Sequence, residues 1–437
     1  MSTAIKDFLG RLLQPPEPEY EPAVTPGLYH YVREAEGMFT RFHLRADPDG
    51  RGMLIANATI AAHLSPTGVL IAKGTLEHQD QDEIIATLAR HFSNVEHQRV
   101  ERDLDRISEL IDKLITPIDN YPIVNLEDAA ISPFKARLMA PLQADTPLID
   151  THNLNTNLLR LWQAAIPHVT FLTVEETPAT EIVRAVERAE DLGMIAGLRA
   201  RASDLSHGVQ IQSLAQAGLD HASIFYASAD KTIHDQIYGR NDSESARTTF
   251  SELQFYEIAP IAIVPLVETT VAGLEETLVD LLSRGVSNVF FFAVAVPDEL
   301  FPRSDGGVLR ASALPQVATL VEELSAYHEV RFIWQAPVMR DDRYSLADQL
   351  RRGARCSDEI SILVEADGEV IPPRGPNRSA GNLLSDDWPA IWNNEAFRRY
   401  RERVEMPTRC SSCPGMAICA ADCPQEILGW SLPSAED

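Results

Sequence analysis

The chain has 437 residues, of which 45% are hydrophobic and 7% aromatic, the composition of a soluble globular protein with two or three domains. Its formal net charge of −26 argues against nucleic acid or an anionic membrane surface as the main partner. Five cysteines are too few for a disulfide scaffold and favour a reducing compartment.

Nothing in the sequence indicates export or a membrane span. The opening residues lack the apolar core of a signal peptide. The longest apolar run, Val289 to Val296, is too short to cross a bilayer. We therefore expect a cytoplasmic protein with no membrane partner.

The N-terminal part is predicted to be a linker followed by a small unit. Residues 1–35 have the pattern of one short helix and a proline-rich linker. Residues 36–115 have the pattern of strands followed by helices. A hairpin is expected over 39–46 and 52–60, because turn-forming residues separate two apolar runs. Apolar residues then recur at helical spacing, and a charged helix is expected over 101–115.

The middle of the chain alternates strands and helices. Residues 116–147 are predicted to be a proline-marked linker, and residues 148–345 to contain repeated strand–helix units. Such units predict a parallel sheet. At least six strands without a Rossmann glycine fingerprint favour a complete or partial (β/α) barrel over an open sheet. The fold class is therefore α/β, with a small winged-helix-like α+β domain before the barrel.

Residues 346–437 are predicted to form a cysteine-rich extension. Four of the five cysteines fall within fourteen positions, in the spacing C-x2-C-x5-C-x3-C: Cys410, Cys413, Cys419 and Cys423. Thiolates are soft donors that suit zinc or an iron–sulfur cluster. The spacing predicts a metal site, with buried thiols or disulfides as the alternative.

This region resembles the SPASM extension of radical S-adenosylmethionine (SAM) enzymes. In that pattern an isolated cysteine precedes a glycine by nine to fifteen residues, and a second cysteine follows after four more. Here eleven residues separate Cys356 from Gly368, and Pro373 stands where the second cysteine would be. The central four-cysteine motif is intact, but no final cysteine follows Cys423.

The barrel resembles the radical SAM family but lacks its cluster loop. That loop, C-x3-C-x2-C, holds the iron–sulfur cluster that binds SAM, and the matching positions here are His152, Thr156 and Leu159. Leucine cannot ligate iron and threonine is a poor ligand. Of the family's Gly-Gly-Glu-Pro motif, only Glu176 remains. The resemblance implies a degenerate member for which SAM is not the expected cofactor.

The small N-terminal unit resembles the PqqD family. That family has a Leu-Asn-Pro-Thr-like turn before its helices, and here Leu64-Ser65-Pro66-Thr67 occupies the place. The resemblance implies a domain that binds the leader segment of a precursor peptide. An unrelated winged-helix-like domain is the alternative.

The SPASM resemblance also bears on the metal. It implies that Cys410, Cys413 and Cys419 belong to one cluster, and Cys356 and Cys423 to another, so neither cluster has all its ligands from cysteine. A single site could form from the four central cysteines, or from the first three with Cys356. It could hold one [4Fe–4S] cluster or tetrahedral zinc.

Other polar and aromatic residues have structural interpretations. Glu175 and Glu176 could be an acid/base pair, but solvated loop carboxylates are the simpler interpretation. His234 and Asp235 are adjacent on a helix and do not face each other, so capping or surface polarity explains them better. Two tryptophans, Trp388 and Trp392, lie one helical turn apart and are expected to pack on the barrel.

Together these features predict a pseudo-radical-SAM scaffold that binds a precursor peptide, or a true radical SAM enzyme, during peptide maturation. The alternative is an enzyme. It could be an iron–sulfur protein that uses the C-terminal cluster for electron transfer, or a barrel with a new activity.

Overall fold

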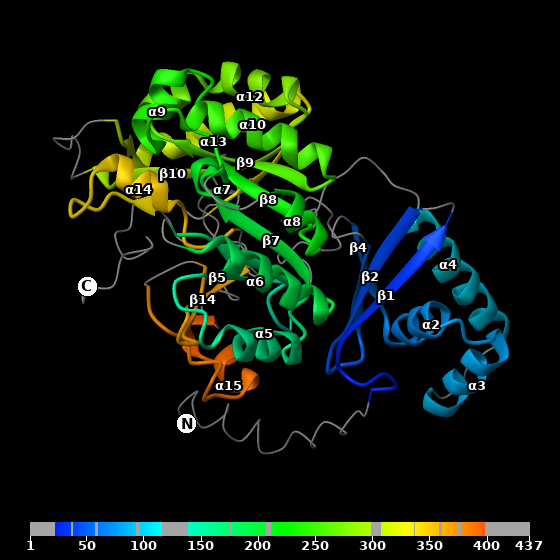
Figure 1. The fold of residues 1–437 in the computed structure, drawn as a ribbon. Coiled ribbons are helices and arrows are strands. Elements are labelled where there is room, and N and C mark those ends of the chain that lie inside the picture. Colours follow the sequence, from blue (N-terminus) through cyan, green and yellow to red (C-terminus); the bar gives the residue numbers. More distant parts are fainter. Residues whose placement is uncertain are drawn as a thin grey trace, which may run out of the picture. The chain divides into compact units, whose positions relative to one another are not determined.

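The computed structural model divides into two compact units, one of residues 1–54 and 62–116 and the other of residues 55–61 and 117–437 (Figure 1). The structure describes residues 22–35, 38–56, 60–92, 97–115, 139–174, 177–206, 211–298, 307–335, 337–357, 361–373 and 377–397.

The first unit is a four-stranded sheet with helices packed against it (Figure 1). The strands lie side by side in chain order: β1 (Gly27–Ala35), β2 (Met38–Ala46), β3 (Gly52–Ala56) and β4 (Ile60–Leu64). The helices are α2 (Pro66–Leu76), α3 (Gln81–His91) and α4 (His97–Ile115). β1 pairs with β2 in antiparallel register from Gly27↔Ala46 to Ala35↔Met38.

The local sequence explains why helix α2 begins at Pro66. The Ser65 side chain accepts a hydrogen bond from the backbone N–H of Gly68 at 3.2 Å, and Pro66 occupies the first turn of α2, where a missing N–H costs nothing. The hairpin expected over 39–46 and 52–60 is present as β2 and β3. Residues 27–35, expected to be linker, instead form strand β1.

The second unit is built on parallel strands that curve around a common axis, with helices outside them (Figure 1). Neighbouring strands follow one another in the order β11-β10-β9-β8-β7-β6-β5-β14-β15. The strands are β5 (Gln143–Pro147), β6 (His168–Leu172), β7 (Ile195–Ala200), β8 (His221–Phe225), β9 (Ala259–Leu266), β10 (Asn288–Val296), β11 (Leu309–Arg310), β12 (Arg331–Trp334), β13 (Val338–Met339), β14 (Ser361–Val364) and β15 (Val370–Ile371).

Helices fill the connections between these strands. They are α5 (Leu154–Gln163), α6 (Ala179–Asp191), α7 (Ala202–Ser206), α8 (Ile211–Gln216), α9 (Lys231–Tyr238), α10 (Asp242–Phe255), α11 (Glu268–Ala272), α12 (Leu274–Ser283), the 3-10 turn η2 (Ala311–Ala313), α13 (Leu314–Tyr327), α14 (Leu346–Arg352) and α15 (Trp388–Trp392). The six strands predicted from the apolar runs are present as β6 to β10 and β12, with helices between them. The first barrel strand, β5, lies inside the segment expected to be a linker.

The barrel is partial in the part of the chain that the structure describes. β12 pairs with β10 at one edge and β14 pairs with β5 at the other, and no described pairing joins β12 to β14. A large apolar cluster joins alternate residues of β9 and β10, such as Ile261, Ile263, Phe290 and Phe292, with α9 and α14. This cluster holds one half of the barrel together by apolar burial.

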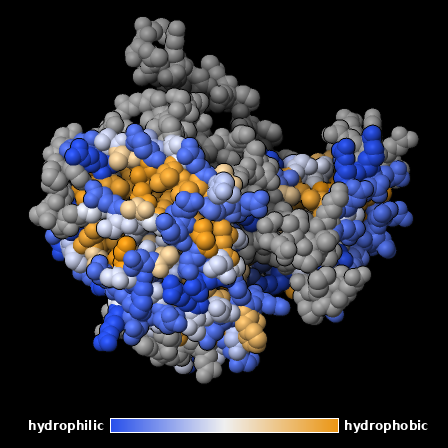
Figure 2. Space-filling view, turned by 90° about the horizontal axis from the view of Figure 1, so that it is seen from above, coloured by the Kyte–Doolittle hydropathy of each residue, from blue (hydrophilic) through white to orange (hydrophobic). Residues whose placement is uncertain are grey.

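The surface mixes hydrophilic and hydrophobic side chains, and hydrophobic ones gather in several areas of the larger unit (Figure 2). Phe255 and Tyr327 are each 78% exposed. No helix within the described ranges is both long and apolar enough to cross a bilayer.

Candidate functional site

The three residues expected at the cluster-loop positions of a radical SAM enzyme follow β5, at the carboxyl end of the first barrel strand. His152 lies in the turn before α5, and Thr156 and Leu159 lie on the helix itself. All three side chains are exposed, and Leu159 is 39% exposed. The structure thus brings them to one open face. An imidazole, a hydroxyl and an aliphatic chain do not fit the three thiolate positions of an iron–sulfur cluster.

The opposite side of α5 faces the protein and explains the asparagines of the Asn-Leu-Asn stretch. Leu158 and Leu161 are fully buried there. The Asn153 side chain donates to the carbonyl oxygen of Ala366 at 3.3 Å, and Asn157 donates to that of Glu365 at 3.4 Å. These contacts attach α5 to the turn between β14 and β15, so the asparagines have a structural role here.

A buried polar cluster joins the first barrel strands to the segment around Cys356. The Asp145 carboxylate, fully buried on β5, accepts hydrogen bonds from the Ser357 backbone N–H, from the Ser357 hydroxyl at 2.8 Å and from Gln143 at 3.0 Å. Gln143 also donates to the Thr170 hydroxyl at 2.8 Å. Burial raises the pKa of Asp145, while the Arg199 guanidinium and the Ser357 hydrogen bonds oppose that rise.

Two further contacts hold the same segment. The Arg199 side chain donates to the carbonyl oxygen of Ala354 at 3.0 Å, and Gln335 donates to that of Ser357 at 3.1 Å. Burial lowers the pKa of Arg199, and the Asp145 charge opposes the change. Residues 354–357 are therefore fixed from β5, β7 and the end of β12. This cluster was not predicted from the sequence, although an aspartate and a glutamine in the short strand QADTP were a signal.

Cys356 lies within this fixed segment as a buried free cysteine, 2% exposed. It packs with Leu363 and Ile371 of the β14–β15 hairpin and with Leu172. Burial raises the pKa of its thiol, and the neighbouring Asp145 adds to the rise. The thiol thus has the surroundings of a packed core residue.

The other four predicted metal ligands, Cys410 to Cys423, lie outside the described residues. Within the described ranges, no three side chains of His, Cys, Asp or Glu are grouped so that they could hold a metal ion. Cys356 is the only one of the five cysteines placed, so the described site supplies one sulfur donor. A [4Fe–4S] cluster needs four ligands.

Two histidines form a second buried polar contact, at the amino ends of their strands. The Nε2 atoms of His168 on β6 and His221 on β8 are 2.6 Å apart. Burial lowers the pKa of His221 to about 3, so the ring is neutral at physiological pH. Between them, β7 carries Gly197, where a Cβ atom would lie 2.2 Å from the His221 ring. The close packing of the His221 ring against β7 therefore requires a glycine at position 197.

The remaining residues considered from the sequence have structural roles. His234 is fully buried: it accepts from the Ala227 N–H at 3.2 Å and contacts Asp242 at 3.0 Å. The Asp235 carboxylate accepts from the Ser243 N–H at 2.9 Å, as expected of a capping residue. Two tryptophans, Trp388 and Trp392, stack with ring centroids 5.7 Å apart. Glu175 and Glu176 lie outside the described residues.

Comparison with known proteins agrees with this architecture. The SPASM model, described as an iron–sulfur cluster-binding domain, matches residues 356–414. The structure is similar to that of SuiB from Streptococcus suis bound to SAM, with a TM-score of 0.51 and 12% identity, covering 93% of this chain and 99% of SuiB. SuiB bound to its precursor peptide SuiA matches with a TM-score of 0.50, 12% identity and the same coverage.

At this identity the likeness establishes the fold. No curated protein matches the chain in sequence. The chain therefore has the α/β fold of a radical SAM protein, with a small antiparallel sheet before a partial parallel barrel and a C-terminal segment that matches the SPASM domain.

Proposed function

We propose that the chain is a scaffold in peptide maturation that binds a precursor peptide, or a partner enzyme, and does not itself cleave SAM. The observation that carries the proposal is the open face of α5. There lie His152, Thr156 and Leu159, the residues expected from the sequence at the three positions of the cluster loop. Reductive cleavage of SAM in this fold needs an iron cluster at that place, and these side chains offer too few suitable donors.

The small sheet of the first unit supports the binding part of the proposal. Its outer strands, β1 and β4, each have one edge that pairs with no other described strand. An extended peptide can add to such an edge through main-chain hydrogen bonds. SuiB, which shares the fold, has been solved with a precursor peptide. We expect a leader peptide to bind along one of these edges.

The C-terminal cysteines would then have a structural role. We propose one metal site built from Cys410, Cys413, Cys419 and Cys423, holding a [4Fe–4S] cluster or zinc. A metal bound in a small loop contributes its binding free energy to folding. The match to an iron–sulfur domain over residues 356–414 favours iron. The same match is also compatible with a second function, in which the cluster transfers electrons to a partner enzyme.

A SAM-cleavage assay tests the proposal. The protein is reconstituted anaerobically with iron and sulfide and incubated with SAM and dithionite. We expect no 5′-deoxyadenosine above a no-protein control, while a SAM-cleaving radical enzyme in the same assay produces it. Product formation by this chain above the no-protein control would end the proposal. Its persistence in the His152→Ala/Thr156→Ala variant would point to a cluster elsewhere.

A peptide titration tests the binding part. Leader peptides encoded beside this gene are titrated into the full-length protein and followed by calorimetry. Binding tighter than ~1 mM, roughly the weakest affinity worth calling specific, is expected for at least one of them. Failure of all of them would leave the first unit without the proposed role.

A further inference from the structure

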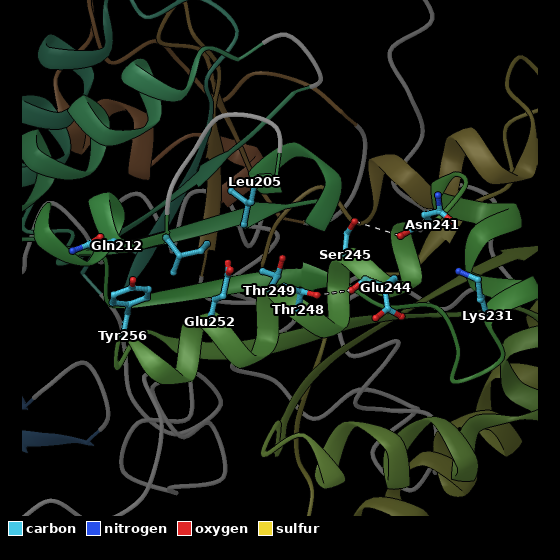
Figure 3. Close-up of a pocket in the computed structure, with 11 residues that line it drawn as sticks. Leu205, Gln212, Lys231, Asn241, Glu244, Ser245, Thr248, Thr249, Glu252 and Tyr256 are labelled. Atoms are coloured by element: carbon cyan, nitrogen blue, oxygen red, sulfur yellow. Dashed lines mark hydrogen bonds between the residues drawn. The ribbon is translucent and has the colours of Figure 1, made fainter.

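A pocket of about 760 Å³ is lined mainly by residues of α10, together with residues of α7, α8 and α9 (Figure 3). One wall is the polar face of α10, and the opposite wall comes from the end of α7 and the start of α8. The volume is within the range of pockets that bind ligands or peptide side chains. Its lining residues are Leu205, Ile211, Gln212, Lys231, Asn241, Glu244, Ser245, Thr248, Thr249, Glu252 and Tyr256.

Most polar groups on the α10 wall already have partners within the helix. The Ser245 hydroxyl donates to the carbonyl oxygen of Asn241 at 3.3 Å, and the Thr248 hydroxyl donates to that of Glu244 at 3.1 Å (Figure 3). The one basic lining residue, Lys231, is paired with Asp235 at 3.1 Å. Its charge is therefore compensated outside the pocket.

Three groups on this wall have no such partner. Glu244 and Glu252 are exposed, and neither carboxylate forms an ion pair with any described residue. Thr249 is only 4% exposed, yet its hydroxyl makes no hydrogen bond within the described part of the chain. Because Thr249 lines the pocket, its hydroxyl is available to pair with a hydrogen-bonding group of a bound ligand. Thr249 lies between the two glutamates along the helix (Figure 3).

The spacing of these groups suggests the shape of the ligand. Glu244 and Glu252 are eight residues apart, which places them about 12 Å apart along the helix axis. In an extended peptide, side chains four residues apart lie on the same face and are separated by about 13 Å. Two basic side chains at that interval would each reach one carboxylate, and a peptide group between them would reach Thr249.

The apolar lining fits the same ligand. Leu205 and Ile211 offer surface on which the methylene stems of lysine or arginine can pack. Tyr256 follows α10 and adds an aromatic ring beside Glu252 (Figure 3). A cation close to such a ring gains further stabilisation.

We propose that this pocket binds an extended peptide segment that carries two basic residues four positions apart. The contact is separate from the strand-edge binding proposed for the first unit. Disrupting either one therefore leaves the other in place, and the two proposals can fail independently.

Fluorescence anisotropy with labelled synthetic peptides and the full-length protein tests the spacing. One nine-residue peptide carries lysines at positions 3 and 7, a second carries them at positions 3 and 5, and a third carries glutamates at 3 and 7. We expect the first to bind about tenfold more tightly than the second, because one charge-assisted contact is lost. The glutamate peptide should not bind. Equal affinity for both lysine peptides would overturn the proposal.

Matched variants test the site. The double variant Glu244→Gln/Glu252→Gln should weaken binding of the first peptide at least tenfold. The control is Glu187→Gln/Glu276→Gln, which changes the net charge equally at exposed positions on α6 and α12. This control should bind the first peptide as tightly as the wild type does. Thr249→Val should weaken binding several-fold and leave the urea midpoint of the free protein unchanged or higher, because the hydroxyl has no partner there. Equal losses in both glutamate pairs, or wild-type binding by Thr249→Val, would exclude this pocket.

Discussion

Gly197 is the residue at which a single methyl group should matter most. A Cβ atom there would meet the His221 ring at 2.2 Å and the Thr170 hydroxyl at 2.8 Å, and neither neighbour lies at the surface. Gly197→Ala should therefore reduce the free energy of unfolding by about 1–3 kcal/mol, the usual effect of overpacking. Urea denaturation measures the loss.

A double-mutant cycle is the control for this prediction. His221→Ala removes the ring that the new methyl group would meet. In that background, Gly197→Ala should cost clearly less than in the wild type, because the closer of its two clashes is gone and only the contact with the Thr170 hydroxyl remains. Additive losses would show that the alanine disturbs something other than the histidine.

His221 should also make stability depend on pH. Histidine in an unfolded chain has a pKa near 6.5, whereas burial lowers the pKa of His221 to about 3. As the pH falls, the His221 ring is therefore protonated in the unfolded chain before it is protonated in the folded protein. Stability from the neutral ring is complete above pH 6.5 and is lost as the pH falls towards 3. Between pH 7 and pH 5 the loss should be about 2 kcal/mol.

Urea curves of the wild type and His221→Gln at the two pH values isolate this effect from that of other groups. The variant should lose about 2 kcal/mol less than the wild type on acidification. The same loss in both proteins would mean that His221 accepts a proton in the folded state as easily as in the unfolded chain.

Among the elements, the surroundings of Cys356 favour one of the two sets of metal ligands left open by the sequence, the four central cysteines without Cys356. Cys356 is enclosed by Leu172, Leu363 and Ile371, and a cluster beside its sulfur would displace them. We therefore expect Cys356→Ala to keep the full metal content of the protein. Cys413→Ala should lose the metal, because one of four thiolates is missing.

Elemental analysis of anaerobically purified protein, for iron and zinc together, measures both variants. Loss of metal in Cys356→Ala would instead assign that thiol to the site. Retention in Cys413→Ala would remove the central motif from metal binding altogether.

The elements predicted from sequence were those with a strong repeating pattern. The apolar runs of β6 to β10 and the amphipathic face of α6 have a clear period, and the structure contains them. β1 and β5 were missed for physical reasons. β1 contains polar and aromatic residues on both faces, and β5 is a five-residue strand with a buried aspartate and glutamine. Its polar side chains bond to each other and to distant residues such as Ser357 and Thr170.

The candidate site was predictable only in part for the same reason. A cysteine spacing is local and can be read directly, so the SPASM match was expected. The Asp145–Ser357 contact joins positions 212 residues apart in the chain. The α10 pocket likewise brings α7 and α8 against α10. Such contacts depend on the tertiary fold, and no local pattern encodes them.

The whole molecule consists of two compact units, and this division should govern how it unfolds. Each unit has its own buried core, with Leu88 in the first and Phe250 in the second almost fully buried. A chain of this kind need not follow one two-state transition. We expect two steps in urea, monitored by circular dichroism.

Two core variants assign the steps and link them to function. Leu88→Ala should shift only one transition and Phe250→Ala only the other, each by about 2–5 kcal/mol, since both remove buried side-chain volume. A peptide that binds the first unit at a hundred times its Kd should then stabilise only the transition sensitive to Leu88→Ala, by about 2.7 kcal/mol. A lysine-spaced peptide in the α10 pocket should stabilise only the transition sensitive to Phe250→Ala. If both variants and both peptides shift one common transition, the units do not fold independently, and the expectation of two steps is wrong.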